Sequence, residues 1–141
     1  MPPNYSTMPL SPKTMERAFA LVAGIAPDVT LELWQSFASR REHFVAVTEN
    51  GDGYLRGLCI YAVANVTDER PVIEAMLFAA LAAVNRRAVA RTMLEFIKSE
   101  ARRVGSETIR FRTPSAEDLA LLLSGRMRLA EMGDATTMRI S

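Results

Sequence analysis

Residues 82–94 read AAVNRRAVARTML, and they connect an apolar run to the start of a helical pattern. Before them, residues 72–81 (VIEAMLFAAL) are almost continuously apolar, which is typical of a central strand buried on both faces. After the basic pair, residues 86–104 carry apolar side chains at helical spacing, and Gly105 is a stop signal. The stretch therefore predicts a buried strand followed by a long helix whose first turn is basic.

The neighbouring segments extend this pattern to a mixed sheet. Residues 107–113 (ETIRFRT) indicate another strand, so residues 72–112 form a strand–helix–strand unit with a parallel pair and a right-handed crossover. Upstream, residues 43–49 and 54–66 flank the turn signal NGDG and indicate an antiparallel hairpin. Gly57, inside the second of these strands, marks a bulge or a close backbone approach.

The remaining expectations concern the two ends of the chain. Ser11 and Thr30 are suitable N-cap residues for two early helices. The expected elements are helices over residues 11–27, 30–41 and 115–125 and two short final strands over residues 127–132 and 135–140. Residues 1–10 are expected to form a flexible N-terminal arm before a single domain over residues 11–141. The predicted fold class is α+β, with a mixed antiparallel and parallel central sheet flanked by helices.

Composition limits the class of function. The chain has 141 residues, 49% of them hydrophobic and 23% charged, which is ordinary for a soluble globular protein. A net charge of +1 argues against a dedicated nucleic-acid binder, because such proteins usually carry a strong basic excess. No segment has the length and apolarity of a membrane span or a signal peptide, so a cytoplasmic protein is expected.

Side chains with metal or redox chemistry are few. Cys59 is the single cysteine, which fits a reducing compartment, and its apolar neighbours indicate a buried small hydrophobe. His43 is the single histidine and lacks a partner motif that would make it half of a catalytic Cys–His pair. No cluster has metal-ligand spacing, so no metal is expected.

The start of the long helix suits an anion. The first turn of a helix has unpaired N–H groups and a partial positive charge, which together favour a phosphate. Small side chains at Ala88 and Ala90 allow close approach, and Arg86, Arg87 and Arg91 add positive charge. Cations at a helix N-terminus oppose the macrodipole by about 0.3–1 kcal/mol each, and a bound anion would remove that cost. The alternative is a surface helix whose first turn is basic.

In its element order and at this junction, the chain resembles the GNAT acyltransferases (GCN5-related N-acetyltransferases). The family carries Gln/Arg-x-x-Gly-x-Gly/Ala between its central strand and long helix, and residues 85–90 read NRRAVA at that place. Asn85 replaces the Gln or Arg, while Ala88 and Ala90 stand on the two small positions. The resemblance implies a GNAT-like fold and acetyl-CoA as cosubstrate. The candidate cofactor-binding residues are Phe78, Ala79, Ala80, Asn85, Arg86, Arg87, Ala88, Val89, Ala90 and Arg91.

Glu74 is the candidate catalytic residue. A carboxylate in an apolar central strand is costly to bury without a partner, and such burial would make the ionised carboxylate a stronger proton acceptor, which suits a general base. The resemblance implies the same role, since some family members place a glutamate on this strand to take the proton from the amine. The alternative is that Glu74 lies near a strand end and faces solvent.

The resemblance implies transfer of an acetyl group from acetyl-CoA to a primary amine, on a small molecule or a protein, by direct attack. The acceptor would enter between the early helices and the antiparallel strands. Leu121 stands where the family often carries a tyrosine that protonates the leaving thiolate. A catalytically inactive GNAT-like module for protein interaction or assembly, including a homodimer, is the alternative, and the eight methionines suit such a contact surface.

Overall fold

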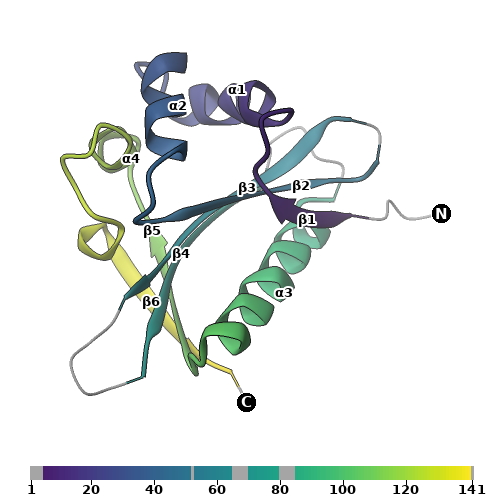
Figure 1. Cartoon of the computed structure of the whole chain (residues 1–141), viewed down its shortest axis with the longest axis vertical. Coiled ribbons are helices and arrows are strands. Elements are labelled where there is room, and N and C mark those ends of the chain that lie inside the picture. The colour runs from purple at the N-terminus through teal and green to yellow at the C-terminus, as the bar shows by residue number, and fades with distance from the viewer. Residues whose placement is uncertain (1–4, 52, 65–69, 80–84, 141) are drawn as a thin grey trace.

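The computed structural model describes residues 5–51, 53–64, 70–79 and 85–140, which form a six-stranded sheet with helices on both faces (Figure 1). In chain order the elements are β1 (Ser6–Pro9), α1 (Met15–Ile25), α2 (Leu31–Ala38), β2 (Phe44–Glu49), β3 (Leu55–Ala64), β4 (Val72–Ala79), α3 (Arg86–Val104), β5 (Thr108–Thr113), α4 (Ala116–Leu123), the 3₁₀ turn η1 (Leu129–Glu131) and β6 (Asp134–Arg139).

The sheet is mixed, as predicted. Its strands lie in chain order from β1 to β6, and all neighbours are antiparallel except β4 and β5, which are parallel. Parallel neighbours need a crossover connection, and α3 lies between these two strands in the sequence. The α+β fold class, the antiparallel hairpin and the parallel pair are therefore confirmed.

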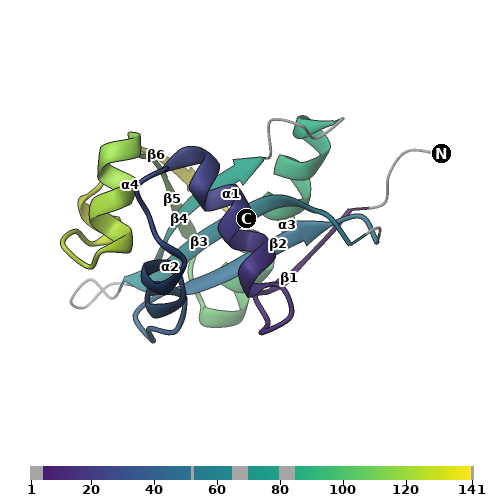
Figure 2. The same ribbon diagram turned by 90° about the horizontal axis from the view of Figure 1, so that it is seen from above.

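The two faces of the sheet bury separate cores. On one face α3 packs through its buried stripe, Val89, Met93, Ile97 and Ala101, against a side of the sheet that includes Cys59. Helices α1, α2 and α4 cover the opposite face (Figures 1 and 2). Cys59 has no exposed surface, as expected for a small hydrophobe, and burial raises the pKa of its thiol.

Trp34 connects the two early helices. Its indole is fully buried, and Nε1 donates to the carbonyl oxygen of Met15 at 2.9 Å. A buried indole N–H needs such an acceptor, and here the acceptor comes from the first turn of α1. The hydrogen bond thereby fixes α2 against the start of α1.

Gly57 on β3 combines both features expected of it. The register passes from Thr48–Gly57 to Glu49–Leu55, so one extra residue bulges beside the glycine. A Cβ atom at Gly57 would lie 2.8 Å from Cγ1 of Val89 and 2.9 Å from Sδ of Met93. The missing side chain therefore lets α3 approach the sheet closely.

The predicted helix ends are confirmed in part. The Thr30 side chain accepts from the Leu33 amide, and Gly105 closes α3 with a left-handed φ of 78°. The predicted Ser11 cap is wrong, because α1 begins at Met15. Ser11 instead accepts backbone hydrogen bonds through its carbonyl in the turn that precedes the helix.

Two other predictions are wrong. Residues 6–9 of the expected flexible arm form β1, which pairs with β2, and the hydroxyls of Thr7 and Thr48 are 2.7 Å apart. Residues 127–132 do not form a strand, because Leu129 and Met132 are both buried across the single turn η1. A spacing of three suits a turn, whereas a strand would place these two side chains on opposite faces.

We predict that Gly57→Ala lowers the free energy of unfolding by about 1–3 kcal/mol, because its methyl group overpacks the contact with α3. Gly24→Ala is the matched control: it lies in α1, and a Cβ there meets nothing within 4 Å. That control should gain about 0.5–1 kcal/mol from helix propensity. Urea denaturation measures both, and equal effects would contradict the close approach at Gly57.

Candidate functional site

Strands β4 and β5 part halfway along β4. β4 pairs with β3 over its whole length, but it pairs with β5 only from Val72–Thr108 to Ala75–Phe111. Among the described residues, Met76–Ala79 therefore have no strand partner on the β5 side. At about 3.3 Å per residue, this open edge is about 13 Å long. The open edge runs from Ala75, the last paired residue, to the carboxyl end of β4, and α3 is the next element in chain order.

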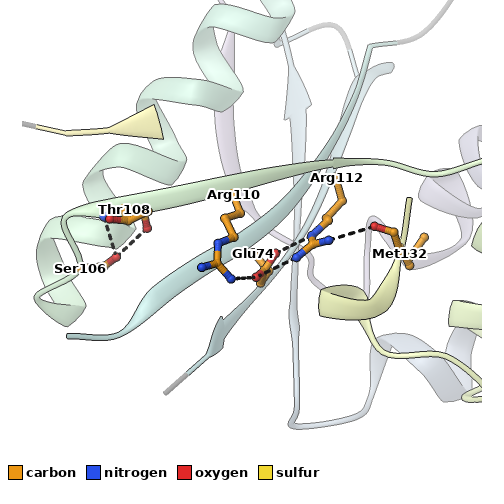
Figure 3. A network of polar contacts seen from close by, with 6 residues as sticks. All are labelled: Glu74, Ser106, Thr108, Arg110, Arg112 and Met132. Carbon is orange, nitrogen blue, oxygen red and sulfur yellow. Dashed lines mark hydrogen bonds and ion pairs between the residues drawn. The ribbon is translucent and has the colours of Figure 1, made fainter. Parts of the chain in front are cut away.

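Glu74 lies just before this parting and is held by two arginines (Figure 3). It is only 1% exposed. Arg112 donates from Nε to Oε2 at 2.8 Å and from Nη2 to Oε1 at 3.3 Å, while Arg110 lies 3.4 Å from Oε1. Arg112 also donates to the carbonyl oxygen of Met132 at 3.2 Å. The alternative that Glu74 faces solvent is therefore wrong.

These contacts bear on the predicted base. A general base needs a lone pair directed at the proton that it removes. Both carboxylate oxygens of Glu74 already accept hydrogen bonds from guanidinium groups. The role of Glu74 as base stays a prediction, and the geometry favours a role in holding Arg112 in place.

The start of α3 is partly capped. The Asn85 side chain accepts from the Ala88 amide at 3.0 Å, and the Asn85 carbonyl accepts from the Val89 amide at 3.2 Å. The Val89 bond is the first regular bond of the helix, so the Ala88 amide is the one expected open donor that is occupied. Among the described residues, the amides of Arg86 and Arg87 have no acceptor. Fewer backbone amides are therefore available to an anion than the sequence analysis predicted.

The other predicted binding residues are divided between surface and core. The side chains of Arg86, Arg87 and Arg91 are exposed, and none pairs with a carboxylate in the part of the chain that the structure describes. Val89 is fully buried against the sheet. The remaining positions are half-buried or outside the described residues: Phe78, Ala79, Ala88 and Ala90 are half-buried, and Ala80 is outside.

A cavity of about 630 Å³ lies on the face of the sheet that α1, α2 and α4 cover. Its walls come from the end of α2, strands β3 and β4, and the segment from α4 to η1. Glu74 forms part of the wall, and the other charged or titratable lining residues are Arg40, Glu42, His43 and Arg128. No sequence pattern predicted that these residues meet.

His43 has a defined tautomer in this wall. Its Nε2 lies 2.6 Å from the carbonyl oxygen of Phe37, and its ring stacks on the Phe37 ring at 3.8 Å. Because a carbonyl only accepts, Nε2 carries the proton and Nδ1 keeps its lone pair in the neutral ring. Burial lowers the pKa of His43, against the opposing effects of the Phe37 hydrogen bond and Glu42.

Sequence reasoning missed His43 as a site residue because its main partner is a backbone carbonyl. Its position at the start of an apolar strand was visible, but the end of α2 that it contacts was expected to continue to residue 41. The helix ends at Ala38, and the imidazole contacts Phe37 in its last turn. A signal was available only in the alternation of β2, which puts His43 on the same face as Val45.

Comparisons with solved structures identify the fold. An aminoglycoside N-acetyltransferase, AAC(6')-Iy, in complex with CoA superimposes with a TM-score of 0.65, at 14% identity over 98% of this chain and 92% of that one. The ribosomal-protein-alanine N-acetyltransferase of Brucella melitensis biovar Abortus 2308 gives 0.69, at 12% identity over 84% and 88%. This chain has the GNAT fold.

The GNAT fold is shown by shape alone, since no protein-family model and no curated protein sequence matches the chain. A structure named as a transcriptional regulator, from Bacillus halodurans C-125, also has this shape, with a TM-score of 0.62 and 12% identity over 84% of this chain and 87% of that one. Proteins named for different roles therefore share the architecture, and function has to be argued from the site.

Two features are absent from the described residues. No helix within them has the length and apolarity to cross a membrane. No group of three or more His, Cys, Asp or Glu side chains there could hold a metal ion.

We predict that Glu74→Gln lowers the free energy of unfolding by about 3–5 kcal/mol, because the nearly buried Arg112 loses its carboxylate. Replacing Glu74 and Arg112 together by methionine should recover most of this loss, since no unpaired charge remains. Glu107→Gln is the control, because Glu107 pairs with exposed Arg70, and it should cost less than about 1 kcal/mol. A Glu74→Gln protein as stable as this control, in urea denaturation, would contradict the buried pair.

The lowered pKa of His43 gives a pH dependence. The folded protein binds this proton less tightly than the unfolded chain, so the stabilisation is present above about pH 6.5 and is lost as pH falls through the folded pKa. The wild type should therefore lose unfolding free energy between about pH 7 and pH 5, and His43→Gln should lose less. Parallel curves for the two proteins would show that burial does not disfavour the imidazolium.

Proposed function

We propose that the protein transfers an acetyl group from acetyl-CoA to a primary amine by direct attack. The observation that carries this proposal is the open edge of β4, which runs from the parting of β4 and β5 toward the basic start of α3. Among the described residues, the open edge of β4 offers backbone groups without a strand partner, and the start of α3 offers positive charge. An elongated ligand with amide groups at one end and phosphates at the other matches both.

Acetyl-CoA would bind along this path. The amide groups of its pantetheine arm can pair with Met76–Ala79 in the manner of an added strand. Its pyrophosphate would meet the amides of Arg86 and Arg87 and the exposed guanidinium groups at this end of α3. The acetyl end would then lie at the parting, beside Ala75.

The chemistry requires a neutral amine at that point. Its nitrogen attacks the thioester carbonyl carbon, the C–N bond forms, and the C–S bond breaks with CoA thiolate as the leaving group. The backbone N–H group of the open edge that lies nearest the parting and points away from β3 would stabilise the developing oxyanion. Leu121 offers no acid, so water would protonate the thiolate, and Glu74 would keep Arg112 and β5 in place beside the thioester.

The comparisons support the general activity, which is acetyl transfer to nitrogen. The superimposed aminoglycoside N-acetyltransferase was solved with CoA, and the Brucella protein is named for acetyl transfer to a protein. A GNAT-like module without activity is the second candidate, and the occupied Ala88 amide favours it, because Asn85 takes a donor that a phosphate could use. Cofactor binding separates the two functions.

We predict that acetyl-CoA at a hundred times its Kd stabilises the protein by about 2.7 kcal/mol, measured as a rise in melting temperature. Arg86→Ala with Arg87→Ala should weaken binding at least tenfold, because two charges near the pyrophosphate are lost. The binding should also weaken with added salt.

Arg102→Ala is the matched control for the double variant. It removes an exposed arginine from the same helix, about 24 Å away along its axis, and should leave the Kd unchanged. The absence of any thermal shift at millimolar acetyl-CoA would reject the proposal and leave the non-catalytic module. Equal loss of binding in the control would show that the contribution is general charge, without a site at the start of α3.

A further inference from the structure

We propose that β6 pairs with β6 of a second copy of this chain, antiparallel and centred on Thr137, so that one continuous sheet runs through a symmetric dimer. The interaction surface is the free edge of β6, which is the last strand of the sheet. Strand β5 separates this edge from β4, so the dimer does not depend on the proposed acetyl transfer.

Strand β6 is exposed along almost its whole length. Residues 134–137 and Arg139 are exposed, and Met138 is half-buried. Successive residues of a strand point to opposite faces of the sheet, so both faces of β6 are open to solvent. Within the described residues, no strand pairs with β6 on the side away from β5. An edge strand this open offers its backbone groups to another chain.

One hydrogen bond shows which backbone groups of β6 point outward. The Ile140 amide donates to the carbonyl oxygen of Glu107 at 2.9 Å, in register with the β5–β6 ladder. In antiparallel sheets, successive residues direct their N–H and C=O groups alternately to the two sides of the strand. The even-numbered residues of β6 therefore point to β5. The residues whose backbone groups point to the free edge are Ala135, Thr137 and Arg139.

The opposite edge of the sheet is protected. The Leu10 amide donates to the carbonyl oxygen of Val45 at 2.9 Å, so the same alternation directs the backbone of Pro9 to the outer side of β1. Proline has no N–H group, and natural sheets use it on edge strands to prevent further pairing. Residues 135–138 of β6 contain neither proline nor a charged side chain. The free edge of β6 is therefore the edge suited to pairing.

The exposed backbone groups determine the register of the pair. Outward-pointing residues of one copy have to lie opposite outward-pointing residues of the other. A pairing centred on Thr137 satisfies this condition and uses residues 134–140 completely. It sets Thr137 opposite the partner's Thr137 and Ala135 opposite the partner's Arg139, and each of these pairs makes two backbone hydrogen bonds. The dimer thereby satisfies groups that an isolated chain leaves to water.

The charges of β6 favour an antiparallel second copy. Asp134 begins the strand and Arg139 ends it, so its two ends carry opposite charge. Antiparallel pairing in this register brings each Arg139 to within one position of the partner's Asp134. The attraction is repeated at both ends of the contact, whereas a parallel pair would set like charges side by side.

The same register covers apolar surface. On the face of the sheet that α3 covers, Met138 lies beside Ile109, and Thr136 lies beside the half-buried Phe111. In the dimer Thr136 is opposite the partner's Met138, so the two methionines are diagonal neighbours, about 7–8 Å apart. Long side chains reach across such a distance, and the dimer therefore buries the methionine that the single chain leaves half-exposed.

The first experiment measures the association state by sedimentation velocity. The wild type should form a dimer whose fraction rises with protein concentration. Thr137→Pro should be a folded monomer, because the N–H group that it removes makes no bond within the chain. Thr136→Pro is the matched control: it removes a bond to β5 and should lower the melting temperature more than Thr137→Pro does.

Two outcomes of this experiment would overturn the inference. One is a wild type that remains monomeric up to about 100 μM, a concentration at which even a weak specific contact is populated. The other is a Thr137→Pro protein that still dimerises, because the contact would then lie elsewhere on the molecule.

Hydrogen exchange tests the assigned direction of the backbone groups. The amides of the even-numbered residues 136, 138 and 140 should be protected in dilute and in concentrated protein. Those of Ala135, Thr137 and Arg139 should exchange at least about tenfold more slowly in concentrated protein than in dilute protein. Equal exchange of these three amides at both concentrations would contradict pairing at this edge.

A cross-link tests the register without requiring that proline be tolerated. Hydrogen-bonded antiparallel partners have Cα atoms about 5.5 Å apart, which is within the range of about 4.4–6.8 Å that a disulfide spans. Thr137→Cys should therefore form a covalent dimer on mild oxidation. Ser99→Cys, exposed on α3, is the control, and the buried Cys59 does not contribute. Equally fast cross-linking of the two variants would overturn the inference.

Discussion

The Arg112 side chain joins three segments at the point where the sheet opens. It belongs to β5, pairs with Glu74 on β4, and donates to the carbonyl oxygen of Met132 after η1. Glu74 is almost fully buried, so its charge is satisfied only while β5 keeps this position. The open edge of β4, one wall of the cavity and the place of η1 all depend on this contact.

The same contact lies at the point where β4 and β5 part. Beyond Ala75 and Phe111 the parallel pairing stops, and the Glu74–Arg112 ion pair spans this end of the ladder. Among the described residues, Met76–Ala79 have no strand partner on the β5 side. Backbone groups on such an edge need water or a ligand as hydrogen-bond partners.

Local sequence patterns predicted much of the fold. The stripe of Val89, Met93, Ile97 and Ala101, with Asn85 before it and Gly105 after it, specifies α3 without reference to the rest of the chain. The errors occur where a partner far along the chain decides the structure. β1 forms because β2 offers an edge, and residues 129–131 turn because the core needs both Leu129 and Met132.

The candidate site was predictable to a smaller extent. Glu74 was found as a buried carboxylate, but its partners were not, although alternation along β5 puts Arg110 and Arg112 on one face. Their meeting with Glu74 depends on the parallel register, which the sequence does not state. His43 was missed for a different reason. Its ring is fixed by a backbone carbonyl, and because every residue carries one, no residue type in the sequence marks this partner.

The complete burial of Cys59 has a practical consequence for detecting chemistry. A reaction that consumes a CoA thioester liberates a sulfhydryl group, which aromatic disulfide reagents convert into a coloured product. The folded chain carries a single sulfhydryl of its own, sealed between β3 and the helix on that face and held in its unreactive form. The absorbance that develops in such an assay therefore measures released CoA thiol, because the folded protein contributes no reactive thiol of its own.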